Sequence, residues 1–172
     1  GGPVNGEDSK GRLRALRGLA HVPEASNLRI VGLERASNVD DAISIAHTVG
    51  SPPQNIVLAD SSGNIAWTIM GRIPLRNGYN PQLPTSWADG QTGWNGWLPS
   101  EDYPILLNPA ADAIWTANAR VVEGAALKKI GEGGYPLGAR AKQIRDSLLE
   151  LERATIEDML AIQLDDQALL HE

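Results

Sequence analysis

Apolar residues near the middle of the chain form two short runs, at 56–59 and 65–70, and a polar segment separates them. Short apolar runs bounded by turn-forming residues are typical of β-strands. Gly63, in the intervening segment, can adopt the positive φ that a tight connection needs. The pattern therefore predicts an antiparallel hairpin within residues 54–76.

Two further patterns precede this hairpin. Residues 12–21 alternate apolar side chains such as Leu13 and Ala15 with arginines, which predicts a half-buried strand. Farther along, apolar residues recur at helical spacing behind Asn38, which is placed as an N-cap. We therefore expect a short helix over 39–49.

The end of the chain, 137–172, has the pattern of a helical segment. A helix over 140–151 is predicted by the helical spacing of Ala141, Ile144, Leu148 and Leu151. Thr155 and Asp158 have the spacing of a capping box, which predicts the start of a second helix over 156–164.

Between the hairpin and these helices, the pattern is less regular. Residues 71–112 hold six of the eleven prolines, which predicts a long ordered loop with room for a short strand in it, because proline cannot donate to a sheet ladder. The segment 113–119 ("AIWTANA") reads as a strand, with Asn118 directly after its apolar run. Since strands come first and helices last, we expect an α+β fold, with 1–172 as a single unit.

Three tryptophans lie in the proline-rich segment, at Trp87, Trp94 and Trp97. They could stack on a sugar or a peptide, as in a binding module. The alternative, which we favour, is that they anchor the irregular loop to its own core, because large aromatic side chains bury much apolar area.

Composition excludes several classes of function. The net charge of −6 and a pI of about 5.1 argue against nucleic-acid binding. Cysteine is absent, so a disulfide, a thiolate metal site and a cysteine nucleophile are excluded. No apolar stretch approaches the roughly 20 residues that cross a bilayer, so we expect no membrane-spanning segment.

The residues alone do not assemble a catalytic site. His21, His47 and His171 are far apart in sequence, and we expect His47 on the helix surface or as a satisfied core contact. The acidic pairs at 40–41 and 165–166 read as solvated surface, because adjacent residues on a helix point in different directions.

Longer blocks of sequence carry a family resemblance. "PQNIVLADSSGNIAWTIMGRIPLR", "GYNPQLP", "WNGWLPSEDYPILLNPAADAIWTANAR" and "GARAKQIRDSLLE" occur in this order. In that order and at those intervals, they resemble the later part of the β chain of the penicillin amidase (penicillin acylase) family. "GPV" near the start and "MLAIQLDD" near the end extend the resemblance over nearly the whole chain. These enzymes are N-terminal nucleophile hydrolases that cleave amide bonds, so the resemblance implies a fragment of their layered αββα fold.

The resemblance implies roles for two residues. Asn118 matches the asparagine whose side chain donates to the oxyanion, and Arg140 matches the arginine that supports this asparagine and the substrate. The structural alternatives are an asparagine that ends a strand by bonding its own loop, and an ordinary arginine at a helix start. Ala119 replaces a second asparagine of many relatives, so any role of that neighbour is absent here.

The family's nucleophile is a serine at the first residue of the β chain, which would lie well before Gly1. We therefore expect this chain to be part of an amide hydrolase and to be inactive alone. The partners so implied are the α chain, the N-terminal part of the β chain and a small N-acyl amide substrate. A fragment should also self-associate, because cutting a layered fold uncovers apolar surface. A non-catalytic relative that kept the scaffold is a third alternative.

The resemblance also implies a calcium site in the parent enzyme, with the backbone carbonyl of Pro81 as one ligand. Most carboxylate ligands would come from outside this chain, and an expected aspartate between Asn118 and Arg140 is missing, where only Glu123 and Glu132 are acidic. We expect no cofactor in the fragment. A periplasmic or secreted location of the parent is likewise implied by resemblance alone.

Overall fold

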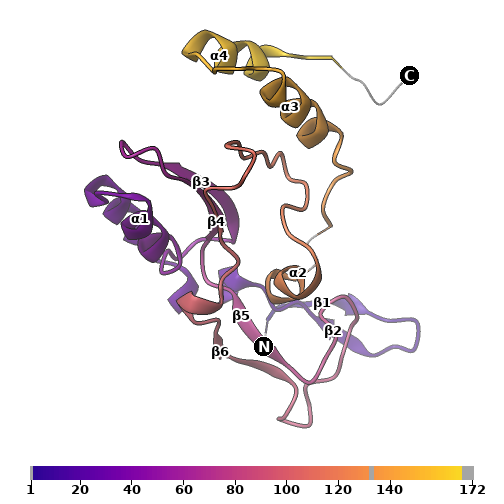
Figure 1. Ribbon diagram of the computed structural model, residues 1–172. Helices are drawn as coiled ribbons and strands as arrows, with labels where there is room; N and C mark the ends of the chain where they lie inside the picture. The colour runs from indigo at the N-terminus through magenta and orange to yellow at the C-terminus, as the bar shows by residue number, and fades with distance from the viewer. Residues whose placement is uncertain (1, 132–133, 168–172) are drawn as a thin grey trace.

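The computed structural model describes residues 2–131 and 134–167, which form three small antiparallel sheets and four α-helices (Figure 1). The strands are β1 (Val4–Glu7), β2 (Leu13–Ala15), β3 (Gln54–Ala59), β4 (Ile65–Met70), β5 (Pro74–Asn77), β6 (Gly93–Trp97) and β7 (Leu106–Leu107). The α-helices are α1 (Val39–Ala46), α2 (Gly124–Ile130), α3 (Ala139–Leu149) and α4 (Ile156–Leu164). The architecture is α+β, as the order of elements along the chain predicts.

The predicted hairpin is the centre of the fold. Strands β3 and β4 pair antiparallel from Gln54↔Met70 to Ala59↔Ile65, and β7 adds to the other edge of β4. The Asp60 carboxylate closes the connecting turn, where its Oδ1 accepts from the backbone N–H groups of Ser62 and Asn64 at 2.9 and 3.0 Å. This is the local bonding that makes aspartate a turn residue.

Helix α1 covers one face of this sheet (Figure 1). Val39 and Ile43 are buried against Ala66 of β4, with Leu58 of β3 packed beside them. Asn38 is the N-cap, and its side chain accepts from Asp41 N–H at 2.8 Å. The predicted helix and cap are confirmed, although the α-helix ends at Ala46 and not at 49.

The main core lies around Trp67 and Ile69 on β4. Together with Ile73, Leu98 and Tyr103 they form a buried cluster. Partly buried side chains from the following segment pack against it, namely Leu106, Ile114, Val121, Val122 and Ile130. This packing attaches residues 106–130 to the sheet.

Three predictions about strands need correction. The half-buried strand over 12–21 is only the exposed three-residue β2, and Leu19–His21 forms a 3₁₀ turn. Residues 71–112 hold more strand than the single short one expected, because β5 pairs with β6 and β7 follows them. Pro74 is the first residue of β5, a position that sheets tolerate for proline.

The predicted strand over 113–119 is wrong. These residues have no strand pairing, and the chain turns back at 116–119. Ile114 is anchored by packing on the Trp67 cluster and not by a ladder of hydrogen bonds. Asn118 therefore lies in a turn and not at a strand end.

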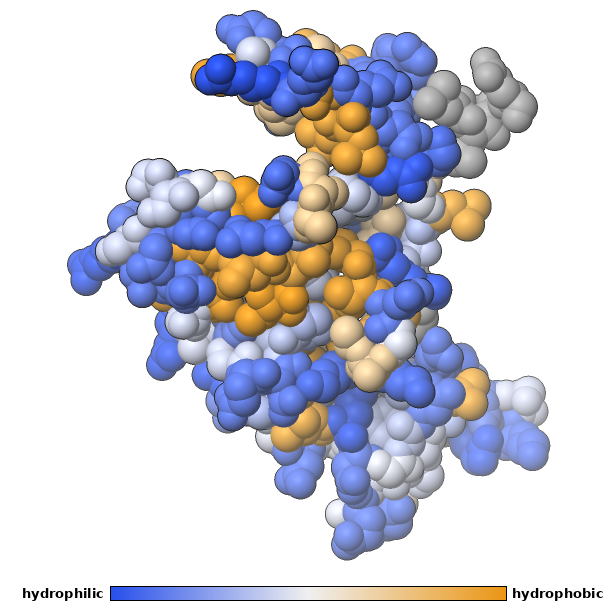
Figure 2. Space-filling view, in the orientation of Figure 1, coloured by the Kyte–Doolittle hydropathy of each residue, from blue (hydrophilic) through white to orange (hydrophobic). Residues whose placement is uncertain are grey.

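The two C-terminal helices are confirmed within a residue or two of their predicted bounds, and the Thr155–Asp158 capping box is formed in both directions. They stand apart from the three sheets (Figure 1). Much of their apolar surface is open, since Ile156 is 84% exposed and Leu164 is 70% exposed. Figure 2 shows apolar side chains on this helix pair and across the middle of the molecule. No helix within the described residues is long and apolar enough to cross a membrane.

Candidate functional site

The candidate site is built on a turn at residues 116–119. The backbone N–H of Ala119 donates to the carbonyl oxygen of Thr116 at 3.1 Å, and the two residues between them have positive φ, 54° for Ala117 and 65° for Asn118. Asparagine tolerates this left-handed conformation, but for alanine it is uncommon and costs roughly 1–2 kcal/mol. Backbone strain of this kind occurs often at functional sites.

Arg140 joins this turn from the first turn of α3. Its Nη2 donates a hydrogen bond to the side-chain Oδ1 of Asn118 at 2.9 Å. An arginine offers donors only, so the amide oxygen of Asn118 must face it and the NH₂ group must point elsewhere. Within residues 2–131 and 134–167, no group accepts a hydrogen bond from Asn118 Nδ2.

Small residues bring the turn and α3 together. Ala119 in the turn is 8% exposed and Ala141 in α3 is 6% exposed, although the site residues themselves are exposed. A Cβ placed on Gly138 would lie 3.9 Å from Ala119 Cβ, so the start of α3 approaches the turn closely. The Arg120 guanidinium also lies 5.8 Å from the ring centre of Tyr135 in the link between the two elements.

The sequence profile of the penicillin amidase family matches residues 1–172. The chain belongs to the penicillin amidase family. Penicillin acylase 2 proenzyme from Pseudomonas sp. (strain SE83) is 30% identical over 130 residues, which are 76% of this chain and 17% of that relative. Acyl-homoserine lactone acylase QuiP from Pseudomonas syringae pv. tomato is 31% identical over 134 residues, 77% of this chain and 16% of the relative. The chain thus spans about a sixth of the length of these curated relatives.

Part of a solved penicillin G acylase has the same fold as this chain. The thermostable penicillin G acylase from Alcaligenes faecalis matches 94% of this chain with a TM-score of 0.70 at 20% sequence identity, and the match covers 29% of that chain. The similarity identifies the α+β arrangement as part of the N-terminal nucleophile hydrolase fold. The roles of Asn118 and Arg140 stay predictions, although the structure does bring the two side chains into contact.

A second polar cluster lies around His47. The side chain is buried and both ring nitrogens have hydrogen-bond partners, which is the second of the two predicted alternatives. Its Nε2 lies 2.9 Å from Thr68 Oγ1 and its Nδ1 lies 2.7 Å from Ser100 Oγ. Because the single Thr68 hydroxyl proton goes to Pro104 O at 2.9 Å, Thr68 must accept from His47 Nε2–H, so the neutral imidazole carries its proton on Nε2. Burial lowers the pKa of His47 from 6.5 to about 4.

The other predicted chemistry does not gather at the Asn118 turn. His21 is exposed, and His171 and Glu132 lie outside the described residues. Asp40, Asp41, Asp165 and Asp166 are exposed, as predicted for solvated carboxylates.

The three tryptophans of the 71–112 segment pack on one another. Trp94 lies between Trp87 and Trp97 at ring-centre distances of 6.4 and 6.5 Å, and its Nε1 donates to Tyr79 Oη at 2.8 Å. The Arg17 guanidinium lies 4.8 Å from the Trp94 ring centre. The three rings thus pack on one another, on Tyr79 and on Arg17, and none of them belongs to the buried core clusters to which we expected them to anchor the loop.

The predicted calcium ligand Pro81 has no cluster of metal-ligating side chains beside it among the described residues. Pro81 lies in an exposed stretch, and the described residues contain no group of three or more His, Asp or Glu side chains that could hold a metal ion. Calcium prefers six to eight oxygen ligands, with carboxylates among them. The residues described do not fit a calcium ion without ligands from elsewhere.

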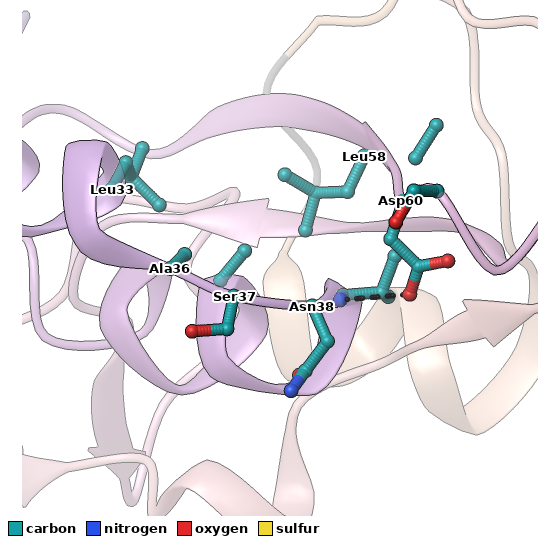
Figure 3. A pocket seen from close by; sticks show the side chains of 10 residues that line it. Leu33, Ala36, Ser37, Asn38, Leu58 and Asp60 are labelled. Atoms are coloured by element: carbon teal, nitrogen blue, oxygen red, sulfur yellow. Dashed lines mark hydrogen bonds between the residues drawn. The ribbon is translucent and has the colours of Figure 1, made fainter.

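A shallow cavity of about 320 Å³ opens at the start of α1 (Figure 3). Leu33, Ala36 and Leu58 supply its apolar wall. Asp60 stands at its edge, where Oδ2 accepts from the Val39 N–H at 3.2 Å. None of the predicted site residues lines it.

Proposed function

We propose that this chain supplies the side-chain half of the oxyanion hole of an amide hydrolase, with Asn118 Nδ2 as the donor. The observation that carries the proposal is the Arg140–Asn118 hydrogen bond, which fixes the amide by its oxygen and leaves its NH₂ group available. We call the longer protein of which this chain is proposed to be a part the parent protein.

The chemistry requires a donor that is in place before the reaction. In the proposed step, a terminal serine hydroxyl attacks the scissile carbonyl carbon, its proton passes to the serine's own α-amino group, and negative charge develops on the carbonyl oxygen. Asn118 Nδ2 then donates to that oxygen. Donors held at about 2.7–3.1 Å from the oxyanion lower the barrier because they need no reorganisation.

The intermediate then collapses. The C–N bond breaks, the amine leaves with the proton, and water hydrolyses the acyl-enzyme. The serine and the second oxyanion donor are proposed to come from parent segments outside this chain. Arg140 acts by orienting Asn118, and its exposed guanidinium is also accessible to a substrate.

The substrate class that we propose is a small N-acyl amide. The names of two relatives, a penicillin acylase and an acyl-homoserine lactone acylase, support an acyl group as the common element. The partners that we propose are the α chain and the N-terminal part of the β chain of the same precursor. A periplasmic or secreted location, and a calcium ion held by the Pro81 carbonyl with carboxylates from those partners, are further proposals for the parent.

The test is amine release by the purified parent protein from a penicillin and from an N-acyl homoserine lactone. We expect release from at least one compound, and its loss when the terminal serine is replaced by alanine. If the parent lacks that serine, or releases no amine from either compound, the chain is a non-catalytic relative and the proposal fails.

A further inference from the structure

Arg76 makes a contact that no role assigned so far explains. It lies on β5, and its guanidinium reaches the C-terminal end of α2, where Nη1 donates to Lys129 O and Nη2 donates to Ile130 O, both at 3.3 Å. The last carbonyl groups of a helix lack donors within the helix and carry partial negative charge. Arg76 therefore caps α2 from a neighbouring sheet.

Gly131 makes room for this cap. A Cβ placed there would lie 3.2 Å from Arg76 Nη2 and 3.3 Å from its Cζ, so the guanidinium lies against the glycine backbone. Gly131 also has φ of 94°, which a side chain would strain. The positive φ therefore favours glycine here, and a Cβ at this position would press on the Arg76 guanidinium.

The Arg76 guanidinium loses contact with water when it caps α2. Burial of the Arg76 guanidinium lowers its pKa, and within the described part of the chain Arg76 forms no ion pair that would compensate. A half-buried arginine that bonds only backbone carbonyls is well suited to fixing the position of a backbone segment.

The segment so fixed is connected to the candidate site. Asn118 precedes α2 by six residues, and Val121 and Val122 between them pack on the Trp67 cluster. The chain is thus anchored on both sides of Asn118. Ile114 packs on the Trp67 cluster before the turn, and Val121, Val122 and Ile130 of α2 pack on it after the turn. Helix α2 has no side-chain N-cap. Contacts near its C-terminal end attach it to the rest of the fold, among them the packing of Ile130, the Arg76 cap and the 2.7 Å Lys129–Asp102 ion pair.

We propose that Arg76 is a positioning residue for catalysis. By capping α2, it fixes the segment that follows the 116–119 turn, and so it fixes the position of Asn118. This inference rests on the proposed oxyanion role of Asn118. A shift of about 1 Å in a catalytic group can cost up to about 100-fold in rate, so a contact remote from the substrate can control kcat.

The test compares Arg76→Lys with Arg153→Lys, an exposed arginine outside the site, in the mature parent protein with active sites titrated by a covalent inhibitor of the terminal serine. We expect Arg76→Lys to lower kcat per active site about 10-fold with KM nearly unchanged, and Arg153→Lys to change neither. Arg76→Gln, which keeps donors without the charge, is the second variant.

The decisive measurement repeats Arg76→Lys in the Asn118→Ala background. If Arg76 acts through Asn118, its effect on kcat disappears there. Equal fold losses in both backgrounds, unchanged kcat per active site, or failure of both Arg76 variants to fold would overturn the inference and leave Arg76 a stability residue. Near-normal kcat in Asn118→Ala alone would instead overturn the oxyanion role.

Discussion

Arg140 holds the side-chain carbonyl oxygen of Asn118 at 2.9 Å across the gap between α3 and the 116–119 turn. The contact decides which end of the amide faces the open side of the turn. A guanidinium bonded to the oxygen also polarises the amide, which strengthens the N–H groups as donors. In the proposed oxyanion hole, the Asn118 NH₂ group is therefore oriented by Arg140 without any help from a substrate.

Replacing Asn118 by alanine in the mature parent protein should lower kcat by about 100- to 1,000-fold while KM changes little. The reason is that the hydrogen bond to the oxyanion becomes strong only as charge develops in the transition state. Steady-state kinetics on a substrate of the parent measures both constants, with processing of the precursor confirmed by mass.

Asn118→Asp is the matched control for this variant. It keeps an oxygen for Arg140 but removes both N–H donors and adds a negative charge beside the oxyanion, so its kcat should be at or below that of Asn118→Ala. Arg140→Lys, which keeps one donor to the amide, should lose less. Near-normal kcat in Asn118→Asp would mean that the amide does not donate to the oxyanion.

Acid should destabilise the fold through His47. The folded protein keeps this imidazole neutral down to a pKa of about 4, because it is buried, whereas the unfolded chain takes up the proton near 6.5. The unfolded state thus binds more protons between these values, and the free energy of unfolding falls as pH drops from about 6.5 to about 4. The loss amounts to roughly 3 kcal/mol at most and is complete below pH 4.

Denaturant unfolding of the parent at several pH values measures this loss. His47→Gln removes the titrating group and should flatten the profile in that window, although the variant is less stable at neutral pH because the bonds to Thr68 and Ser100 change. A wild-type profile that is flat from pH 6.5 to 4 would contradict the buried neutral histidine.

The 172-residue chain made on its own should self-associate. Val57 on β3 is 52% exposed, Leu160 on α4 is 53% exposed, and no strand among the described residues pairs with the outer edge of β3. Open apolar area and a free strand edge pair readily with another chain. Light scattering across a range of concentrations should show a mass above 18.4 kDa.

Val57→Lys tests which surface is responsible. A lysine on an edge strand discourages pairing, so this variant should shift the mass toward the monomer. A monomer at all concentrations in the unmodified chain would refute self-association.

The elements that the sequence predicted are those whose signals are local. The β3–β4 hairpin is set by the Asp60 turn, and α4 by the reciprocal Thr155–Asp158 cap, so neighbouring residues are sufficient to specify each. The contact between Asn118 and Arg140 was implied by resemblance alone, since nothing in the spacing of two residues so far apart places them together.

The failures are elements that depend on distant contacts. The apolar run at 113–119 has a strand-like pattern. Its Ile114 packs on the cluster around Trp67 instead of facing a neighbouring strand, and the chain turns at Ala117, where φ is positive. Asn118, a residue that tolerates the left-handed conformation, was the one local signal of that turn. Helix α2 was missed because its cap comes from Arg76, more than fifty residues before it.

One carboxylate joins the start of helix α1 to the β3–β4 turn. Asp60 Oδ1 closes the β3–β4 turn, and Asp60 Oδ2 accepts from the N–H of Val39, the first residue of α1. When the turn forms, the carboxylate is therefore already placed to bond the start of the helix. All of these contacts lie within residues 38–70, where loop closure is fast because few residues separate the partners. The helix and hairpin should therefore become protected as one kinetic unit, ahead of the β5–β6 sheet and the 116–119 turn. Pulsed hydrogen exchange during refolding of the parent would show the amides of α1 and β4 protected together, and separate phases for the two would contradict this order.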